Sequence, residues 1–295
     1  MDEAKENNDG KMEVVKFLYQ KFLDDGIAQE DMIVFNHYLS DAIKSHGKGL
    51  SSNNPANFLK DILRSDVRNN RWPQELKNAK ITARQKYRKG RVFAFDSYGT
   101  NQVEPFPDIC ILPEDAAHHE IESVSLPSSA RALGRNDEAW LIQVCVHQRL
   151  VQTHFGLYSP LRDKAIDLFH LQNSVKMTPE IDAIFLLSLR GMGKALVTLE
   201  AKRNEPVLMD QIRAQAALMA KTCSKTKALS DVNWIIPLAA KSQTHAGQRV
   251  VGLFEMEPID VKTGAEAYAA DREHLLDLKI RKSVAYRFSP TVSGI

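Results

Sequence analysis

At 295 residues, with 43% hydrophobic and 26% charged residues, the chain has the size and composition of one large globular domain or two modest ones. It has no apolar run of roughly 18 residues, which argues against a membrane span. Three scattered cysteines without a C-x-x-C pair argue against a cysteine-rich zinc site and fit a reducing cytoplasm. The net charge of +2 is too small to indicate a partner, so the distribution of charge along the chain is more informative.

The N-terminal portion is predicted to be mainly helical. Residues 1–12 are polar and acidic without an apolar signal core, and we expect a disordered tail there. Apolar residues at helical spacing follow at residues 14–23, 32–43 and 57–66. Linkers that contain Gly, Asp, Ser and Asn separate these patterns, so three short helices are expected.

A basic segment follows the predicted helices. Between Lys77 and Arg91 there are seven basic residues and no acid, and Lys89-Gly90-Arg91 is typical of a turn between two strands. A hairpin with this charge suits contacts with DNA phosphates. The expected DNA-binding residues are Arg84, Lys86, Arg88, Lys89 and Arg91. A solvated basic loop is the alternative interpretation.

Short helices followed by a basic hairpin resemble the layout of winged-helix DNA-binding modules, although no diagnostic motif accompanies this layout. The resemblance implies that residues 13–112 form a DNA-binding portion. The alternative is a helical extension that packs on the next domain. Residues 113–136 contain polar breaks with Pro, Ser and Gly, and we expect a linker there.

The segment after this linker is predicted to begin an α/β domain. Apolar residues recur every four positions within residues 137–155, which predicts a helix, and β-branched residues there leave a strand as the alternative. Glu138 lies on the apolar stripe near the start of this helix. Residues 168–177 are then expected to form the first strand of a sheet.

Two apolar runs, residues 180–187 and 195–203, flank the turn sequence Arg190-Gly191-Met192-Gly193-Lys194, which predicts a β-hairpin. Asp182 and Glu200 then lie on adjacent strands, and Lys202 projects from the same face as Glu200. Two carboxylates and one ammonium are therefore expected to converge. Carboxylate pairs bind Mg²⁺, and a neighbouring Lys can orient or deprotonate a metal-activated water.

The chain contains six acid-x-Lys tripeptides, so this pattern alone has little specificity. The serious competitor begins at Asp260, but Pro258 tends to close the preceding strand. Pro107-Asp108 is a second competitor, and no strand-borne acid-x-Lys follows it at hairpin distance. For Glu200-Ala201-Lys202 the alternative is a same-face ion pair on a solvated sheet. Its neighbours are nearly all apolar, which indicates a buried strand whose charges need partners or a metal.

The residues after this tripeptide extend the α/β pattern. Residues 206–221 have the apolar stripe of an amphipathic helix, and residues 231–240 and 249–257 are typical of two further strands. A strand-helix-strand step implies a parallel crossover and hence a mixed sheet. Residues 263–282 show loosely helical spacing and are expected to cover a sheet edge or contribute to a dimer.

This arrangement resembles the PD-(D/E)xK nuclease superfamily. The resemblance implies an α/β fold with a restriction-endonuclease-like core, a central mixed β-sheet flanked by helices, at residues 137–260. Residues 261–295 would then form a C-terminal helix and tail. The resemblance also implies that Asp182 and Glu200 bind a metal ion and that Lys202 assists the attacking water.

Two further residues bear on this resemblance. Ile181 stands where the superfamily usually has Pro before the first Asp, and many members vary at this position. A helix before the first strand often adds another acid to the site in this superfamily, and Glu138 is the candidate for that catalytic role. An acid favoured by the positive end of the helix is the alternative interpretation of Glu138.

The function that the resemblance implies is Mg²⁺-dependent hydrolysis of phosphodiester bonds in double-stranded DNA, by a sequence-specific type II restriction endonuclease of the prokaryotic cytoplasm. A homodimer is expected because two-fold symmetry suits a palindromic site. No membrane partner is expected, and the absence of a G-x-x-x-x-G-K-[ST] motif predicts no nucleotide cofactor. The alternatives are a repair, recombination or phage-defence nuclease of the same superfamily, and a non-catalytic DNA-binding regulator.

Overall fold

The structure is a computed structural model that describes residues 2–53, 55–65 and 67–295. For residues 2–9 and 56 it describes the backbone and not the side chains. The chain divides into two compact units, Met1–Pro107 and Asp108–Ile295, and each is described by itself. Among the described residues, no helix combines the length and the apolar character that a membrane span requires.

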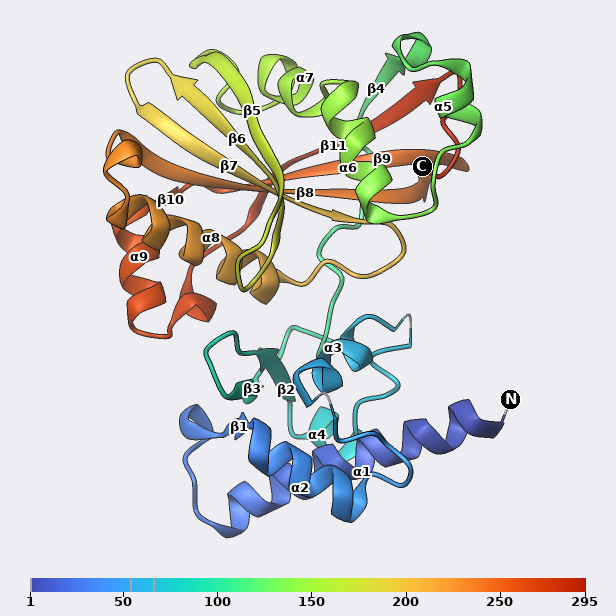
Figure 1. Cartoon of the computed structure of the whole chain (residues 1–295), viewed down its shortest axis with the longest axis vertical. Coiled ribbons are helices and arrows are strands. Elements are labelled where there is room, and N and C mark those ends of the chain that lie inside the picture. The colour runs from blue at the N-terminus through green and yellow to red at the C-terminus, as the bar shows by residue number, and fades with distance from the viewer. Residues whose placement is uncertain (1, 54, 66) are drawn as a thin grey trace. The chain divides into compact units, whose positions relative to one another are not determined.

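The first unit combines helices with a small antiparallel sheet (Figure 1). Its main elements are α1 (Asp2–Asp24), β1 (Ile33–Phe35), α2 (Asn36–His46), α3 (Phe58–Leu63), α4 (Gln74–Asn78), β2 (Ile81–Gln85) and β3 (Arg91–Ser97). The strand order is β1-β3-β2, and both pairings are antiparallel. The expected hairpin is present, and helices lie at or near the three expected segments. The start of the helix expected at residues 32–43 is strand β1 instead, and α4 was not expected.

An aromatic core holds this unit together. The side chains of Trp72, Phe93 and Phe95 are buried, and the indole N–H of Trp72 donates a hydrogen bond to the carbonyl of Ile81 at 2.8 Å. This bond satisfies the one polar atom of a large buried ring. Helix α1 starts at Asp2, where the sequence indicated a disordered tail, and the segment contains good helix formers such as Ala, Glu and Lys.

The second unit is built on an eight-stranded mixed sheet. Its strands are β4 (Ala117–Glu122), β5 (Ala165–Val175), β6 (Ile181–Leu189), β7 (Gly193–Lys202), β8 (Val232–His245), β9 (Gln248–Met256), β10 (Ile259–Asp260) and β11 (Ile280–Ser289). The order is β4-β11-β9-β8-β7-β6-β5, with β10 paired to β8. The β7–β8 and β4–β11 pairs are parallel and the other pairs are antiparallel.

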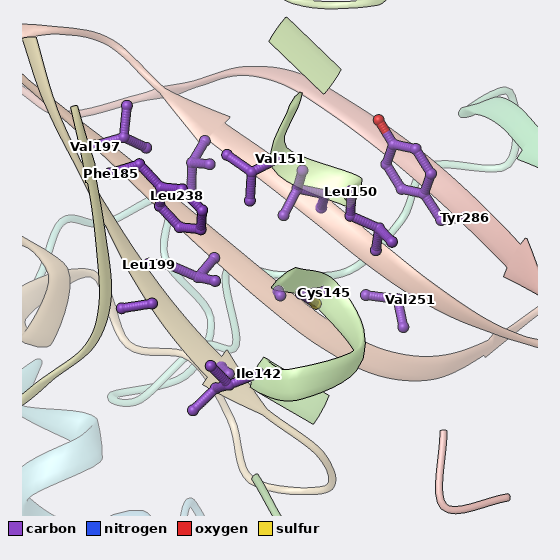
Figure 2. Packing of buried hydrophobic residues seen from close by; sticks show 14 of the residues in the cluster. Ile142, Cys145, Leu150, Val151, Phe185, Val197, Leu199, Leu238, Val251 and Tyr286 are labelled. Atoms are coloured by element: carbon purple, nitrogen blue, oxygen red, sulfur yellow. The ribbon is translucent and has the colours of Figure 1, made fainter. Parts of the chain in front are cut away.

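Helices cover both faces of this sheet (Figure 1). The helices are α5 (Ser128–Ala132), α6 (Glu138–His147), α7 (Leu150–Leu157), α8 (Met209–Lys225) and α9 (Val261–Ala269). Figure 2 shows α6 and α7 packed on one face, where Cys145 and Val151 lie among sheet residues such as Phe185. Helices α8 and α9 pack on the opposite face. The expected α/β unit with a mixed sheet flanked by helices is thus confirmed.

The helix expected at residues 137–155 is confirmed, with a break that divides it into α6 and α7. The break lies at Arg149, whose φ of +53° is left-handed and ends the first helix. Two other segments differ from expectation. Residues 113–136, expected to be a linker, carry β4 and α5, and the expected C-terminal helix and tail ends in β11. Strands β4 and β11 pair with each other across more than half of the chain, and local sequence patterns do not encode such a pairing.

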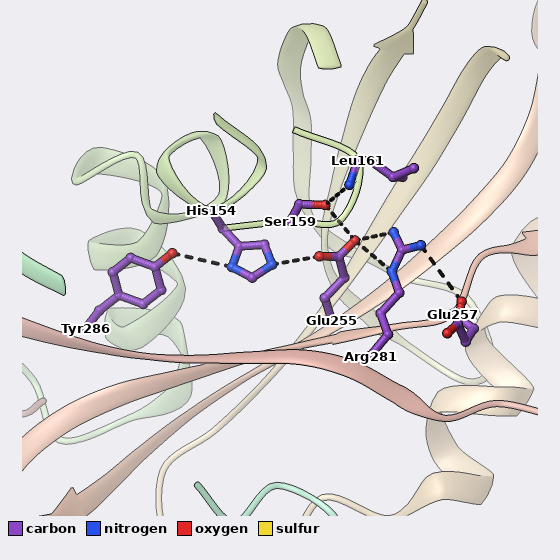
Figure 3. Close-up of polar contacts among 7 residues, drawn as sticks. All are labelled: His154, Ser159, Leu161, Glu255, Glu257, Arg281 and Tyr286. Atoms are coloured by element: carbon purple, nitrogen blue, oxygen red, sulfur yellow. Dashed lines mark hydrogen bonds and ion pairs between the residues drawn. The ribbon is translucent and has the colours of Figure 1, made fainter. Parts of the chain in front are cut away.

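A buried polar network fastens α7 and the loop after it to the sheet (Figure 3). Glu255 of β9 is fully buried, with one carboxylate oxygen 2.8 Å from Nε2 of His154. Its other oxygen accepts hydrogen bonds from Ser159 at 3.0 Å and from Arg281 Nε at 3.1 Å. The hydroxyl of Tyr286 lies 3.4 Å from the other ring nitrogen of His154. Each oxygen of the buried carboxylate therefore has a partner.

We expect Glu255→Gln to destabilise the protein by about 3–5 kcal/mol, because it removes the buried counterion of Arg281 and leaves only the more distant Glu257. Glu257→Gln is the matched control, since Glu257 is half exposed and 3.8 Å from the same guanidinium, and its loss should cost less than about 1 kcal/mol. Urea unfolding of both variants measures the difference. Equal effects of the two changes would contradict a structural role for the Glu255 pair.

The same network predicts a pH dependence. Burial raises the pKa of Glu255, but the hydrogen bond and charge of His154 and the charge of Arg281 lower it by more, so the net pKa is below its ordinary value. The contribution of Glu255 to stability is therefore complete above the unfolded-state pKa of about 4.3 and is lost as the pH falls through the lower folded-state pKa.

Candidate functional site

The β6–β7 hairpin brings Asp182 and Glu200 together at one end of the sheet. The two strands are antiparallel, and Ala183 lies opposite Leu199. Asp182 and Glu200, the neighbouring residues, therefore lie opposite each other on the face of the sheet that α8 covers. The Asp182 carboxylate accepts a hydrogen bond from the backbone N–H of Ala201 at 2.7 Å. The register of the hairpin therefore places the two carboxylates as the sequence predicted.

Lys202 links the hairpin to helix α6. Its ammonium lies 2.9 Å from Oε1 of Glu200 and 3.0 Å from Oε1 of Glu138. Glu138 is the first residue of α6, and the Asp137 side chain caps that helix by accepting a hydrogen bond from the N–H of Trp140 at 2.8 Å. The four residues Glu138, Asp182, Glu200 and Lys202, which we call the acidic site, are thus brought together.

Two glutamines of α8 complete the surroundings of Glu200. The side-chain amides of Gln211 and Gln215 donate hydrogen bonds to its two carboxylate oxygens, and Gln215 also donates to the carbonyl of Glu180 at 2.8 Å. Sequence reasoning missed both residues. Gln215 is 1% exposed, and a buried amide needs polar partners, but its burial is known only from the structure.

The pKa values of two residues in the acidic site, Asp182 and Lys202, differ from their ordinary values. Burial, followed by the negative charge of Glu200, raises the pKa of Asp182 to about 7, although the Ala201 N–H and the Lys202 charge act in the opposite direction. Burial lowers the pKa of Lys202, but Glu200 and Glu138 raise it by more, and its net pKa lies above the ordinary value. Lys202 is therefore a cation at neutral pH, which suits it to hold negative charge and not to accept a proton.

The donor set of the acidic site fits a divalent cation that shares its coordination with a substrate. Asp182 and Glu200 repel each other, and Mg²⁺ is commonly bound through one or two carboxylates together with waters and phosphate oxygens. In the part of the chain that the structure describes, no group of three or more His, Cys, Asp or Glu side chains is arranged to hold a metal ion. Water or substrate oxygens would have to supply the remaining ligands.

A second acid–lysine pair lies beside the acidic site. Lys241 of β8 stands opposite Lys202 in the parallel register, and its ammonium contacts the Asp108 carboxylate. The other oxygen of Asp108 accepts backbone hydrogen bonds from Cys110 at 3.1 Å and Val207 at 3.2 Å. Asp108 thus ties the start of the second unit to the segment after β7, although the sequence marked it only as a competing motif.

The competitor at Asp260 has a different structural role. Its carboxylate caps α9 by accepting a hydrogen bond from the backbone N–H of Thr263 at 3.0 Å, and β10 covers only two residues. Lys262 lies inside the helix and not on a strand. The acid and the lysine of this tripeptide therefore do not share a strand face, in contrast to Glu200 and Lys202.

The expected DNA-binding residues lie on the β2–β3 hairpin of the first unit. Gly90 has a φ of +80° and closes the turn, as expected. Arg84 and Lys86 are mostly buried, and the Arg84 guanidinium pairs across the hairpin with Asp96 at 2.8 Å. Arg88 and Arg91 are partly exposed, and Lys89 is exposed at the turn. Lys89 is thus the best placed of the five for contacts with a ligand.

Comparison with known proteins gave no match to a family model, a curated protein or a solved structure.

We expect Asp182→Asn to stabilise the metal-free protein at neutral and higher pH. The folded-state pKa of Asp182, about 7, exceeds its unfolded value of about 3.9, so the wild type loses stability as the pH rises between these values. At pH ~8 the variant should be more stable by up to roughly 2–4 kcal/mol. Urea unfolding in EDTA tests this, with the exposed Asp167→Asn as control. Parallel pH profiles for wild type and Asp182→Asn would contradict the raised pKa.

Proposed function

We propose that this chain is a Mg²⁺-dependent endonuclease of the PD-(D/E)xK superfamily that hydrolyses phosphodiester bonds in double-stranded DNA, and that it acts as a sequence-specific type II restriction endonuclease. The observation that carries the proposal is the acidic site itself. The Lys202 ammonium contacts Glu200 of the same strand and the helical Glu138, and its charge also acts on Asp182 of the neighbouring strand.

The charge of the acidic site favours a functional over a structural role. Three carboxylates face one ammonium, which leaves two negative charges when all are ionised (three minus one). Burial is the main cause of the raised pKa of Asp182, and the negative charge of Glu200 adds to it. A structural ion pair has no need of the third carboxylate, whereas a divalent cation would compensate both excess charges. Such perturbed groups are typical of functional sites.

The chain's own residues would share the work of phosphodiester hydrolysis. Bound Mg²⁺ supplies Lewis-acid polarisation of the phosphoryl group and a lowered pKa for water. Glu200, fixed by Gln211 and Gln215, and Asp182, fixed by the Ala201 N–H, hold their oxygens in place for that ion. Lys202 stays protonated and is positioned by Glu138 to orient the attacking water and to stabilise charge on the phosphate.

The first unit would supply further contacts with DNA. A basic turn with the exposed Lys89 suits backbone phosphates, and the order of short helices followed by a hairpin is compatible with a DNA-binding module. Cleavage of both strands of a palindromic site would require two copies of the chain related by a two-fold axis. We therefore include a homodimer on DNA in the proposal.

Incubation of the full chain with plasmid DNA distinguishes the candidate functions. Mg²⁺-dependent fragments with fixed ends, abolished by EDTA, are expected of a restriction endonuclease. Nicking that follows DNA structure and not sequence would favour a repair, recombination or phage-defence nuclease of the same superfamily. Binding without any cleavage would favour a non-catalytic regulator.

Alanine variants of the acidic site test the catalytic assignment. We expect Asp182→Ala and Glu200→Ala to abolish cleavage and to keep measurable DNA binding, because each removes a ligand of the ion and no distant phosphate contact. Mg²⁺ should also raise the Tm of the wild type and not that of these variants, which is a readout independent of activity. Near wild-type cleavage by either variant would refute the assignment.

A matched pair of lysines tests the acid-x-Lys motif. Lys202→Ala should lower the cleavage rate by about 10²–10⁴-fold, since it removes the cation beside the reacting phosphate. Lys262→Ala, from the competing tripeptide on α9, should remain active. Steady-state cleavage rates of both variants are the measurement. Activity lost at Lys262 and kept at Lys202 would place the active site elsewhere.

The basic hairpin is tested through the salt dependence of binding. Arg88→Ala with Lys89→Ala should weaken DNA binding and lower the slope of log K against log salt by about 0.9 per phosphate contact, because fewer counterions are released. Sequence preference should stay unchanged if these side chains meet only phosphates. Lys21→Ala, an exposed change on α1, is the control. An unchanged slope in the double variant would mean that the basic hairpin is a solvated loop that makes no contact with DNA phosphates.

A further inference from the structure

Two arginines beside the acidic site have no acidic side chain to neutralise them. Arg203 directly follows Lys202 at the end of β7, and Arg249 lies near the start of β9. Arg249 donates a hydrogen bond to the buried Ser242 hydroxyl at 2.6 Å, and Ser242 comes one residue after the register partner of Lys202. The two guanidinium groups thus approach each other across the ends of β7, β8 and β9.

Asp137, whose negative charge acts on Arg203, already has other hydrogen-bond partners. Asp137 accepts hydrogen bonds from Arg135 Nε at 2.7 Å and from the N–H of Trp140 at 2.8 Å. Among the residues that the structure describes, neither Arg203 nor Arg249 has an Asp or Glu oxygen within 4.0 Å. Arg249 Nε makes only a long bond, 3.4 Å, to the carbonyl of Ile295. The two guanidinium groups therefore act on each other electrostatically, and in the described part of the chain neither forms an ion pair with an Asp or Glu side chain.

Arg203 also carries an unsatisfied donor. Its Nε is buried and has no hydrogen-bond partner within the described part of the chain, although the rest of the side chain is partly exposed. Burial, followed by the charge of Arg249, lowers the pKa of Arg203, and the negative charge of Asp137 offsets only part of this. A buried guanidinium N–H without an acceptor costs stability, and so does a like-charge neighbour. Both costs disappear when an anion with several acceptor oxygens binds between the arginines.

We infer that Arg203 and Arg249 form a binding site for a backbone phosphate of the DNA strand, next to the phosphodiester bond that the acidic site cleaves. Guanidinium groups match phosphate oxygens with paired N–H donors, and Arg249 is exposed. Arg203 and Lys202 are consecutive, so the phosphate-binding site and the acidic site share one strand end. This inference rests on the proposed function and assigns substrate contacts distinct from those of the β2–β3 hairpin.

The test compares Arg203→Gln and Arg249→Gln with wild type and with Arg190→Gln. Arg190 is an exposed arginine in the turn at the opposite end of the β6–β7 hairpin, so its charge is matched and its position is remote. Binding of the full chain to duplex DNA is measured in Ca²⁺ over a range of salt concentrations, and Tm is measured without DNA. Cleavage by each protein is followed separately in Mg²⁺.

Each glutamine variant should weaken DNA binding by about three- to tenfold and lower the salt slope by about 0.9, whereas Arg190→Gln should do neither. Arg203→Lys should keep most of the slope, because it keeps the charge. Without DNA the Tm of both glutamine variants should be unchanged or higher, since a like-charge contact is relieved. Residues that only support the fold would show the opposite change in Tm.

The outcomes separate this inference from the proposed function. If the wild type binds and cleaves DNA while both glutamine variants keep its affinity and salt slope, the phosphate site is refuted and the nuclease assignment stands. A clear fall in Tm in both variants would assign the arginines to folding and also refute the site. If the wild type neither binds nor cleaves DNA, the phosphate site and the proposed function are both refuted.

Discussion

The register of the β6–β7 hairpin is the constraint on which the acidic site depends. Side chains alternate across a strand, so a slip of one residue would move Asp182 away from Glu200 and toward the opposite core. The tight turn, with Gly191 and Gly193 at positive φ, and apolar residues on both faces of the strands hold this register. The parallel pairing of β7 with β8 then fixes the hairpin in the middle of the sheet.

Both helical layers contribute to the site at this strand end. Helix α8 presents Gln211 and Gln215 to Glu200 from one face, and α6 brings Glu138 to Lys202 at its first turn. A capped helix start is a rigid position, and a buried amide is held by its own hydrogen bonds. The polar groups are thereby oriented by elements whose places are set by apolar packing, which is the arrangement that reactive sites require.

Two buried charge clusters in the second unit differ in their balance. Glu255 is matched by Arg281 and His154, and its pKa falls below the ordinary value. In the acidic site the pKa of Asp182 rises to about 7, because burial and then the negative charge of Glu200 outweigh the Ala201 N–H and the Lys202 charge. A balanced cluster contributes to folding, whereas an unbalanced one is maintained at a cost to stability. Both residues are buried, so the difference between them lies in their charged partners, and this contrast supports a functional role for the acidic site.

The sequence by itself determined the local elements and the core of the site. Two glycines between apolar runs were enough to predict the β6–β7 hairpin, and strand alternation placed Asp182, Glu200 and Lys202 together. Glu138 was proposed because the resemblance implies an acid on the helix before the first strand, and its place on the helical stripe fitted that role. These features depend on neighbours within about twenty residues, where turn chemistry and periodicity act directly.

Only the tertiary structure decided the contacts that join distant segments. The pairing of β4 with β11, the Asp108–Lys241 contact and the approach of Arg249 to Arg203 each join residues far apart in the chain. Gln215 required the same knowledge, because its partner Glu200 lies on another element. Such contacts follow from how the sheet and its two helical layers pack as a whole, and no local periodicity of a single sequence records that packing.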